Sequence, residues 1–165
     1  YQIYYHATIG TDKQHLQKTM SEINQAHPDV RAVISVNKGL VTQASAAIPV
    51  VPLYFAILYK VMKKAGNHEN CIQQIARLFT QKLYTPTGFR TDENGFIRMD
   101  DYELTPEIQE EVKKCWKAVT TDTVKEYCDI DGYWEDFYHM FGFRYEDIDY
   151  TQDVDADVEI DGVVM

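Results

Sequence analysis

The chain has 165 residues, the length of one domain, and a formal charge of −10 from 16 basic and 26 acidic side chains. This acidic balance argues against nucleic-acid binding and against docking on an anionic membrane, since both need positive charge. With 45% hydrophobic and 13% aromatic residues, the chain can bury a core, which argues against a disordered class of protein.

The negative charge is concentrated at the C-terminal end. Eight acidic residues follow Arg144 without any Lys or Arg, so residues 1–144 carry a net charge of only −2. We therefore expect residues 145–165 to form an acidic tail. Alternating acids from Asp153 to Glu159 are similar to the opening of a calcium loop, but Val158 occupies the position that requires glycine, which favours a solvated tail.

The first predicted element is a helix from about Thr11 to Ala26, because Leu16, Met20 and Ile23 recur at helical spacing. The β-branched run from Arg31 to Val36 predicts a short buried strand. A helix followed by an apolar strand is half of an α/β repeat, the pattern that builds parallel sheets.

An uncharged run from Gly39 to Tyr59 follows this strand. It is nearly as long as a membrane span, but Pro49 and Pro52 would break an inserted helix. We therefore interpret the run as a buried segment at the centre of a soluble fold, with no membrane span. A helix is expected past Pro52 up to Lys64, ended by Gly66.

The second half of the chain predicts three helices and a pair of short strands. Asn67 can cap a helix whose apolar stripe would be buried; that stripe comprises Ile72, Ile75, Ala76 and Phe79. Turn residues around Thr85–Gly88 and Asn94–Gly95 predict a small β-hairpin whose second strand is 96–99. Thr105-Pro106 starts the next helix, and the last helix spans about Gly132 to Met140.

The cysteines do not form a disulfide framework. Cys71, Cys115 and Cys128 are odd in number and scattered, which indicates a reducing, cytoplasmic setting. His68 and Cys71 have half of a zinc spacing, but no second close pair exists, so no metal site is expected. No export signal precedes the first helix, and the absence of an initial Met indicates that Tyr1 is either a truncation boundary or an internal start.

Tyr4 and Lys13 form a candidate catalytic pair. Nine residues apart, they would lie on opposite faces of one continuous helix. Gly10 suggests that the helix begins only near Thr11, which would let the two side chains converge. A lysine ammonium favours the ionised form of a nearby phenol, so such a tyrosine can act as an acid near neutral pH. A coincidental pairing is the alternative, since the chain has 12 tyrosines.

The sequence around this pair resembles the NADH-dependent trans-2-enoyl-CoA reductase family, which also contains enoyl-acyl-carrier-protein reductases. The resemblance extends over the chain up to its acidic end. The motifs that carry it are Ile3-Tyr4, Thr8-Ile9-Gly10-x-x-Lys13, the run from Val41 to Tyr54, the run from Tyr59 to Lys63, and the run from Gly66 to Ile72.

This resemblance implies an oxidoreductase of fatty acid metabolism that reduces the trans-2 double bond of an enoyl thioester with NADH. Tyr4 would stabilise the charge that develops on the thioester oxygen. Lys13 would hold the nicotinamide ribose and bias the pKa of Tyr4. The resemblance also assigns Thr42, Gln43 and Ala44 to the NAD contacts.

The same resemblance places Ser45, Ile48 and Pro49 at the border of the acyl chain. Either a coenzyme A or an acyl-carrier-protein thioester fits, and the oligomeric state is left open. The implied fold is α/β: the C-terminal part of a Rossmann-like, doubly wound parallel sheet, mostly helical in this fragment, with the small β-hairpin named above.

One feature of the family is missing from the sequence. Gly10 is the only glycine before residue 39, so there is no G-x-G-x-x-G turn for the pyrophosphate. We therefore expect residues 1–165 to be the C-terminal catalytic and substrate-binding portion of a larger reductase, inactive alone. The alternative is a non-catalytic truncated relative that acts as a folded interaction module.

Overall fold

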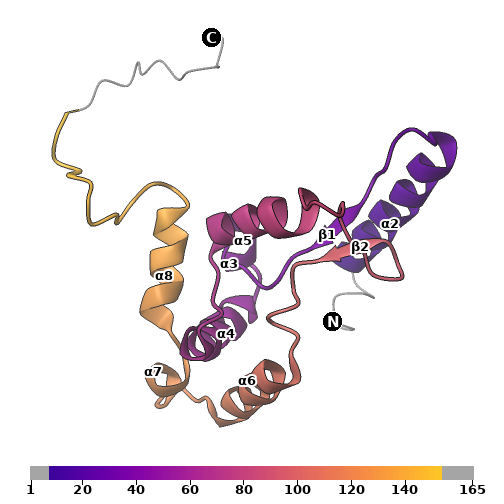
Figure 1. Cartoon of the computed structure of the whole chain (residues 1–165). Coiled ribbons are helices and arrows are strands. Elements are labelled where there is room, and N and C mark those ends of the chain that lie inside the picture. The colour runs from indigo at the N-terminus through magenta and orange to yellow at the C-terminus, as the bar shows by residue number, and fades with distance from the viewer. Residues whose placement is uncertain (1–7, 154–165) are drawn as a thin grey trace.

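A computed structural model describes residues 8–153. Helices dominate this part of the chain, with two short strands among them (Figure 1). In chain order the elements are α2 (Thr8–Ala26), β1 (Ile34–Val36), α3 (Gln43–Ala46), α4 (Val51–Ala65), α5 (Cys71–Arg77), the π-helix η1 (Leu78–Leu83), β2 (Phe96–Arg98), α6 (Pro106–Ala118), α7 (Val124–Tyr127) and α8 (Ile130–His139).

The two strands form a parallel pair. Ile34 lies opposite Phe96, and Val36 lies opposite Arg98. The predicted β-hairpin is therefore wrong within the described residues, because β2 takes its partner from the first third of the chain. The turn residues that suggested a hairpin build a loop instead, in which Asp92 N–H donates to the carbonyl of Phe96 and Gly95 N–H donates to that of Asp92.

Helix α4 forms the centre of the hydrophobic core. Ile57, Leu58, Tyr59 and Met62 are at most 1% exposed, and α4 packs against both α6 and α8. Burying each such aliphatic side chain contributes about 1.5–3 kcal/mol. The uncharged run Gly39–Tyr59 thus supplies a loop, α3 and the first half of α4. No helix among the described residues has the length and apolarity needed to cross a membrane.

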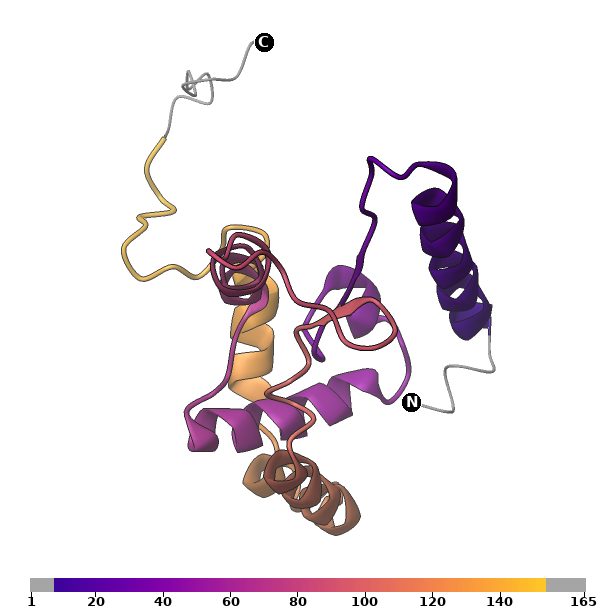
Figure 2. The same cartoon turned by 45° about the vertical axis from the view of Figure 1, so that its right-hand side comes forward.

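Helix α2 differs in two ways from the prediction. It begins at Thr8, so Gly10 lies inside the helix rather than before it. Its predicted apolar stripe is largely exposed, with Leu16 at 48% and Ile23 at 36%. The helix lies beside the two strands, on the side away from α8 (Figures 1 and 2).

Local signals set the ends of two helices as predicted. Gly66 ends α4 with a φ of 74°, a left-handed conformation in which glycine has no steric penalty. Thr105 caps α6 by accepting a hydrogen bond from the backbone N–H of Ile108. The buried residues of α6 are Ile108 and Val112, while Trp116 is 39% exposed.

Helix α5 corrects the prediction more strongly. Its cap is Asn70 rather than Asn67, and Ile72, at 70% exposure, lies outside the core. The inward residues are Gln74 and Arg77. Arg77 Nε donates to Glu69 at 2.5 Å, and its Nη2 donates to the carbonyl of Met99 at 2.8 Å. A buried guanidinium that binds the end of β2 therefore decides which face of α5 points inward.

Strand β1 is shorter than predicted and only half-buried, over Ile34–Val36. The last helix covers Ile130–His139, close to the predicted range. Beyond it, residues 145–153 are exposed and contain neither helix nor strand. The rest of the predicted acidic tail, from residue 154, lies outside the described residues.

Candidate active site

The predicted catalytic pair is only half within the described residues. Tyr4 lies outside them, so its approach to Lys13 stays a prediction. Lys13 lies in the N-terminal half of α2 with its side chain exposed. It is therefore accessible to a ligand that binds beside this helix.

The other predicted contact residues lie together in one excursion of the chain. Residues 39–54 leave the end of β1, form the short helix α3, and return to the first turn of α4. We call this stretch the α3 segment. It contains every candidate residue from Thr42 to Pro49, and it follows the carboxyl end of a parallel strand, where open α/β sheets bind their ligands.

A reciprocal pair of hydrogen bonds shapes the start of α3. Thr42 N–H donates to Ser45 Oγ at 2.8 Å, and Ser45 N–H donates to Thr42 Oγ1 at 3.1 Å, which completes a capping box. Ser45 Oγ also lies 3.2 Å from the carbonyl of Leu40. The Ser45 hydroxyl is thus engaged in holding the helix start.

Gln43 and Ala44 are the first two residues of α3, and both are exposed. Their N–H groups have no carbonyl one turn earlier in the helix to bond. These donors and the exposed Gln43 amide offer polar contacts to a ligand. The sequence resemblance assigned the same two residues to the cofactor.

The segment turns sharply after α3. Ile48 is half-buried and Pro49 is exposed. Val50 has a φ of 72°, a left-handed conformation that is strained for a β-branched residue. The corner between α3 and α4 is therefore held in a strained geometry beside the residues predicted to border the acyl chain.

Three residues that sequence reasoning missed hold the base of the α3 segment. Glu103, 3% exposed, accepts the backbone N–H of Gly39 at 2.5 Å. The hydroxyl of Tyr59 accepts the N–H of Val41 at 3.0 Å. The Lys38 ammonium lies 5.4 Å from the centre of the Tyr59 ring. Lys38 directly precedes the uncharged run in the sequence, but no local signal indicated its role or that of Glu103.

Burial changes the acid–base behaviour of two of these groups. Lys38 is 3% exposed, and desolvation lowers its pKa to about 8, against the raising influence of the Glu103 charge. Burial raises the pKa of the Tyr59 phenol, which keeps the hydroxyl neutral. A charged lysine and a carboxylate thus lie next to a neutral phenol beneath the α3 segment.

A second buried polar group lies between α4, α5 and α8. The His68 ring packs edge-on against Tyr59 with centroids 4.3 Å apart, and its Nε2 lies 3.3 Å from Asp136 Oδ2. Gln74, 2% exposed, has neither amide atom hydrogen-bonded. No sequence pattern predicted this group.

Two cavities lie elsewhere. One of about 410 Å³ is lined by Lys82, Arg90 and Arg98 among others, and one of about 340 Å³ is lined by Asp131, Trp134, Tyr138 and Arg144. Neither includes a predicted site residue. The three cysteines are free, and within residues 8–153 no cluster of His, Cys, Asp or Glu side chains could hold a metal ion.

Two family models match the sequence. The first, described as the trans-2-enoyl-CoA reductase catalytic region, covers residues 1–84. The second, described as the enoyl reductase FAD binding domain, covers residues 91–154. Together they account for most of the chain, and the first contains both members of the candidate catalytic pair and the α3 segment.

Curated relatives match over nearly the whole chain. An enoyl-acyl-carrier-protein reductase [NADH] of Flavobacterium psychrophilum is 45% identical over 98% of this chain and 41% of its own length. The enzyme of the same name from Coxiella burnetii is 46% identical over 99% of this chain and 41% of its own length. A trans-2-enoyl-CoA reductase [NADH] of Ruminiclostridium cellulolyticum is 45% identical over 98% of this chain and 41% of its own length.

Solved structures agree with the sequence matches. The trans-2-enoyl-CoA reductase of Clostridium acetobutylicum in complex with NAD has a TM-score of 0.85 and 45% identity, over 92% of this chain and 40% of that one. The Treponema denticola trans-2-enoyl-CoA reductase in complex with NAD has a TM-score of 0.85 and 47% identity, over 92% of this chain and 38% of that one. The chain thus spans about two fifths of the length of the proteins it matches.

Proposed function

The chain belongs to the trans-2-enoyl-CoA reductase family, and from this premise we propose that the intact protein reduces the trans-2 double bond of an enoyl thioester with NADH. The observation that carries the proposal is the 45–46% identity over 98–99% of this chain to relatives named as NADH-dependent reductases. The enzyme would be an oxidoreductase of fatty acid metabolism, and the free cysteines fit a reducing cytoplasm.

Tyr4 and Lys13 carry the acid–base role in this proposal. As the double bond is reduced at its β-carbon, negative charge develops on the thioester oxygen. The Tyr4 hydroxyl donates a hydrogen bond or proton to that oxygen. Lys13, exposed on α2, holds the nicotinamide ribose and favours ionisation of Tyr4 through its positive charge.

The α3 segment supplies the donors that suit a nicotinamide cofactor. Thr42, Gln43 and Ala44 would hold it, because the exposed start of α3 offers backbone N–H groups and a side-chain amide. When bound, NADH supplies the hydride for the β-carbon of the substrate. The relatives of known structure were solved with NAD or NADH, which supports this cofactor.

Ser45, Ile48 and Pro49 follow in the same segment and would border the acyl chain. Ile48 offers an apolar side chain, while the backbone at Pro49 and Val50 fixes the turn into α4. Relatives of both names occur, enoyl-acyl-carrier-protein reductase and trans-2-enoyl-CoA reductase. We therefore propose that the substrate is an enoyl thioester of either coenzyme A or the acyl carrier protein.

We further propose that β1 and β2 are two strands of a larger Rossmann-like parallel sheet. Their parallel pairing and their position after α2 suit that fold. In this arrangement residues 1–165 are the C-terminal catalytic and substrate-binding portion, with an acidic tail over residues 145–165. The pyrophosphate-binding turn would then lie in another part of the intact protein.

Within residues 91–153, the residues matched by the FAD-binding family model offer no glycine-rich turn for the pyrophosphate of a flavin. A dinucleotide needs a glycine-rich turn that brings backbone N–H groups to its pyrophosphate. Within residues 91–153 the glycines are Gly95, Gly132 and Gly142, which are isolated from one another. A Cβ at Gly132 would meet Lys63 and Asp129 side chains, so this glycine serves internal packing. No step of the proposed reaction uses a flavin.

The experiment that tests the proposal is NADH oxidation by the intact protein with crotonyl-CoA and with the crotonyl carrier-protein thioester. We expect NADH consumption that matches the saturated acyl thioester formed, with at least one of the two substrates. Failure with both, in a protein that binds NADH and is folded, would contradict the proposal and favour a non-catalytic interaction module.

A further inference from the structure

One buried carboxylate holds both ends of the α3 segment. Glu103 lies in the turn between β2 and α6 and is 3% exposed. Its Oε2 accepts the N–H of Gly39 at 2.5 Å, and its Oε1 accepts the hydroxyl of Tyr54 at 2.6 Å. Gly39 is the first residue of the segment and Tyr54 is the last. The two ends of the excursion that carries the candidate contact residues are therefore bridged by the side chain of Glu103.

The position of Glu103 is itself fixed by the sheet and by α6. Met99 N–H and Asp100 N–H both donate to the carbonyl of Val36, which ties the end of β2 to the end of β1. Gln109 Nε2 donates to the carbonyl of Glu103 at 2.9 Å. The carboxylate is thus presented from a backbone that does not belong to the segment it holds.

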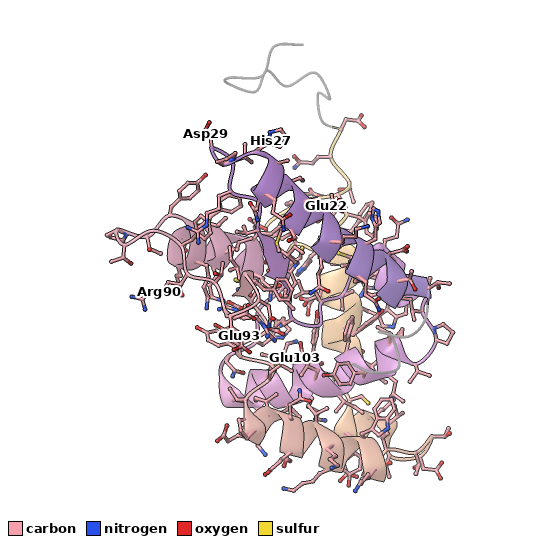
Figure 3. All side chains as sticks on the ribbon, turned by 90° about the vertical axis from the view of Figure 1, so that its right-hand side faces the viewer. Glu22, His27, Asp29, Arg90, Glu93 and Glu103 are labelled. Carbon is pink, nitrogen blue, oxygen red and sulfur yellow. The ribbon has the colours of Figure 1, made fainter. Side chains whose placement is uncertain are left out.

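Close packing leaves little freedom for the base of the segment. A Cβ at Gly39 would lie 2.7 Å from Phe55 Cε1 and 3.2 Å from Leu58 Cδ2. Only a residue without a side chain lets the backbone approach α4 this closely. The approach brings Gly39 N–H and the Tyr54 hydroxyl within reach of one carboxylate, and Glu103 lies beside the ribbon of α4 (Figure 3).

Holding a loop with a buried carboxylate costs desolvation free energy. A charged group loses its hydration on burial and needs a nearby opposite charge and hydrogen bonds to offset the loss. Here the buried Lys38 supplies an opposite charge that interacts with Glu103, and the Gly39 N–H and the Tyr54 hydroxyl supply hydrogen bonds. Apolar packing would hold the core without this cost, so the directional bonds of Glu103 point to a need for defined geometry.

We propose that Glu103 is a positioning residue, which sets the placement of Thr42, Gln43 and Ala44 towards the nicotinamide cofactor by holding Gly39 and Tyr54. This inference rests on the proposed function, since it concerns the same site. In this proposal the buried Glu103 acts through the α3 segment, by way of its bonds to Gly39 and Tyr54. It is set apart from the candidate contacts by about sixty positions of sequence, a separation of the kind that only tertiary structure brings together.

The test compares three variants of the intact protein. Glu103→Leu removes both hydrogen bonds at similar volume. Glu103→Gln keeps an oxygen for the Gly39 N–H and places its NH₂ group beside the Tyr54 oxygen. Its amide exchange and its KM for NADH should therefore stay close to the wild-type values. Glu93→Leu is the matched control, because Glu93 is exposed in the turn before β2 (Figure 3).

Two readouts are measured at a temperature where thermal melts show each variant folded. In Glu103→Leu, backbone amide exchange over residues 39–46 should be about tenfold or more faster, while exchange in β2 and α8 is unchanged, because a buried donor loses its partner. The KM for NADH should rise about tenfold, more than kcat falls, as expected for lost placement of a binding segment. Glu93→Leu should match the wild type in both.

The two proposals fail separately. Equal acceleration of exchange in residues 39–46, β2 and α8 would overturn the role of Glu103, since it would report a general loss of stability. Unchanged exchange and an unchanged KM would also overturn it. If the wild type does not oxidise NADH with either enoyl thioester, the proposed function fails. The exchange comparison then still decides whether Glu103 holds the α3 segment. Should Glu103→Leu not fold, Tyr54→Phe removes one of the two bonds and should accelerate exchange in the same residues.

Discussion

At the scale of single residues, the proposed chemistry depends on a phenol and an ammonium at the start of the chain. Tyr4→Phe in the intact protein should lower kcat by about 10²- to 10⁴-fold, the usual contribution of a positioned proton donor. The dissociation constant for NADH should stay close to the wild-type value, because the ring is kept and only the hydroxyl is lost.

Steady-state kinetics with crotonyl-CoA and a fluorescence titration with NADH measure these two quantities. Tyr5→Phe makes the same change at the next residue and should leave turnover near that of the wild type. Unchanged turnover in Tyr4→Phe would remove Tyr4 from its assigned role.

Lys38 gives a prediction about pH. Its pKa in the folded protein is about 8, below its ordinary value of 10.5, because burial disfavours the charged form. Between pH 8 and 10.5 the unfolded chain therefore binds more protons than the folded one, and the stability contributed at this site rises with pH. Over the full window the gain is about 3 kcal/mol.

The measurement is the free energy of unfolding of the wild type minus that of Lys38→Met, followed by denaturant titration from pH 7 to 10.5. This difference should increase with pH, since the variant lacks the titrating group. Lys113→Met changes an exposed lysine of α6 and should give a flat difference. If the difference is also independent of pH for Lys38→Met, burial does not lower the pKa of Lys38 and the prediction is wrong.

The sequence grouped three candidate contact residues, whose contact with a cofactor stays a prediction. Thr42, Gln43 and Ala44 occur in an ordered motif, and the structure places them together in an exposed helix start. Glu103, Tyr59 and Lys38 escaped the sequence because their roles depend on contacts between distant residues. A glutamate that accepts the Gly39 N–H carries no local mark that distinguishes it from the other acidic residues of the chain.

At the scale of elements, the corner between α3 and α4 is strained. Val50 is 59% exposed and has a φ of 72°. A left-handed L-residue costs roughly 1–2 kcal/mol, and glycine adds roughly 0.5–1 kcal/mol of entropy loss on folding. Val50→Gly should therefore raise the free energy of unfolding slightly, by less than about 1 kcal/mol.

Denaturant titration of the intact protein measures this change. Val30→Gly is the control, because Val30 is similarly exposed at 51% and its φ is not positive; it should destabilise the protein. If both substitutions destabilise equally, the left-handed conformation of Val50 stores no strain.

Elements with local signals were predictable, and those decided by tertiary contacts were not. Thr105 and Gly66 mark helix ends because caps involve only neighbouring residues. The predicted hairpin was wrong because the partner of β2 is decided by the whole fold. The outward face of α5 was predicted as buried because its apolar spacing is regular, whereas the Arg77 interactions with Glu69 and Met99 turn the helix the other way.

At the scale of the whole molecule, the described residues hold a core around α4 and the α3 segment with its candidate contact residues, but no glycine-rich dinucleotide turn. We therefore predict that the isolated 165-residue chain does not oxidise NADH with crotonyl-CoA, while the intact protein does. Circular dichroism should confirm that the isolated chain is helical before its activity is measured. NADH consumption by that chain at a rate near the intact protein's would contradict the proposed division of the site.

Sequence patterns predicted an α/β chain with a largely helical composition, and the structure bears out the helices. The strand pair is parallel, as expected for the strand after α2, whereas β2 had been assigned to a hairpin. The charge distribution can also be taken directly from the sequence, because residues 1–144 are nearly neutral and eight acidic residues follow them. The packing of α4 between α6 and α8 was not, since an amphipathic pattern identifies a buried face without identifying what covers it.

The parallel strands also constrain how the chain folds in time. Residue 34 must meet residue 96, with α3, α4 and α5 between them, so this pairing closes a long loop and loses much chain entropy before it gains two short strands. The helices between them need only local contacts and form faster. Productive folding should therefore be limited by the late pairing of β1 with β2. The two ends of the α3 segment would then be the last part of the chain to become native.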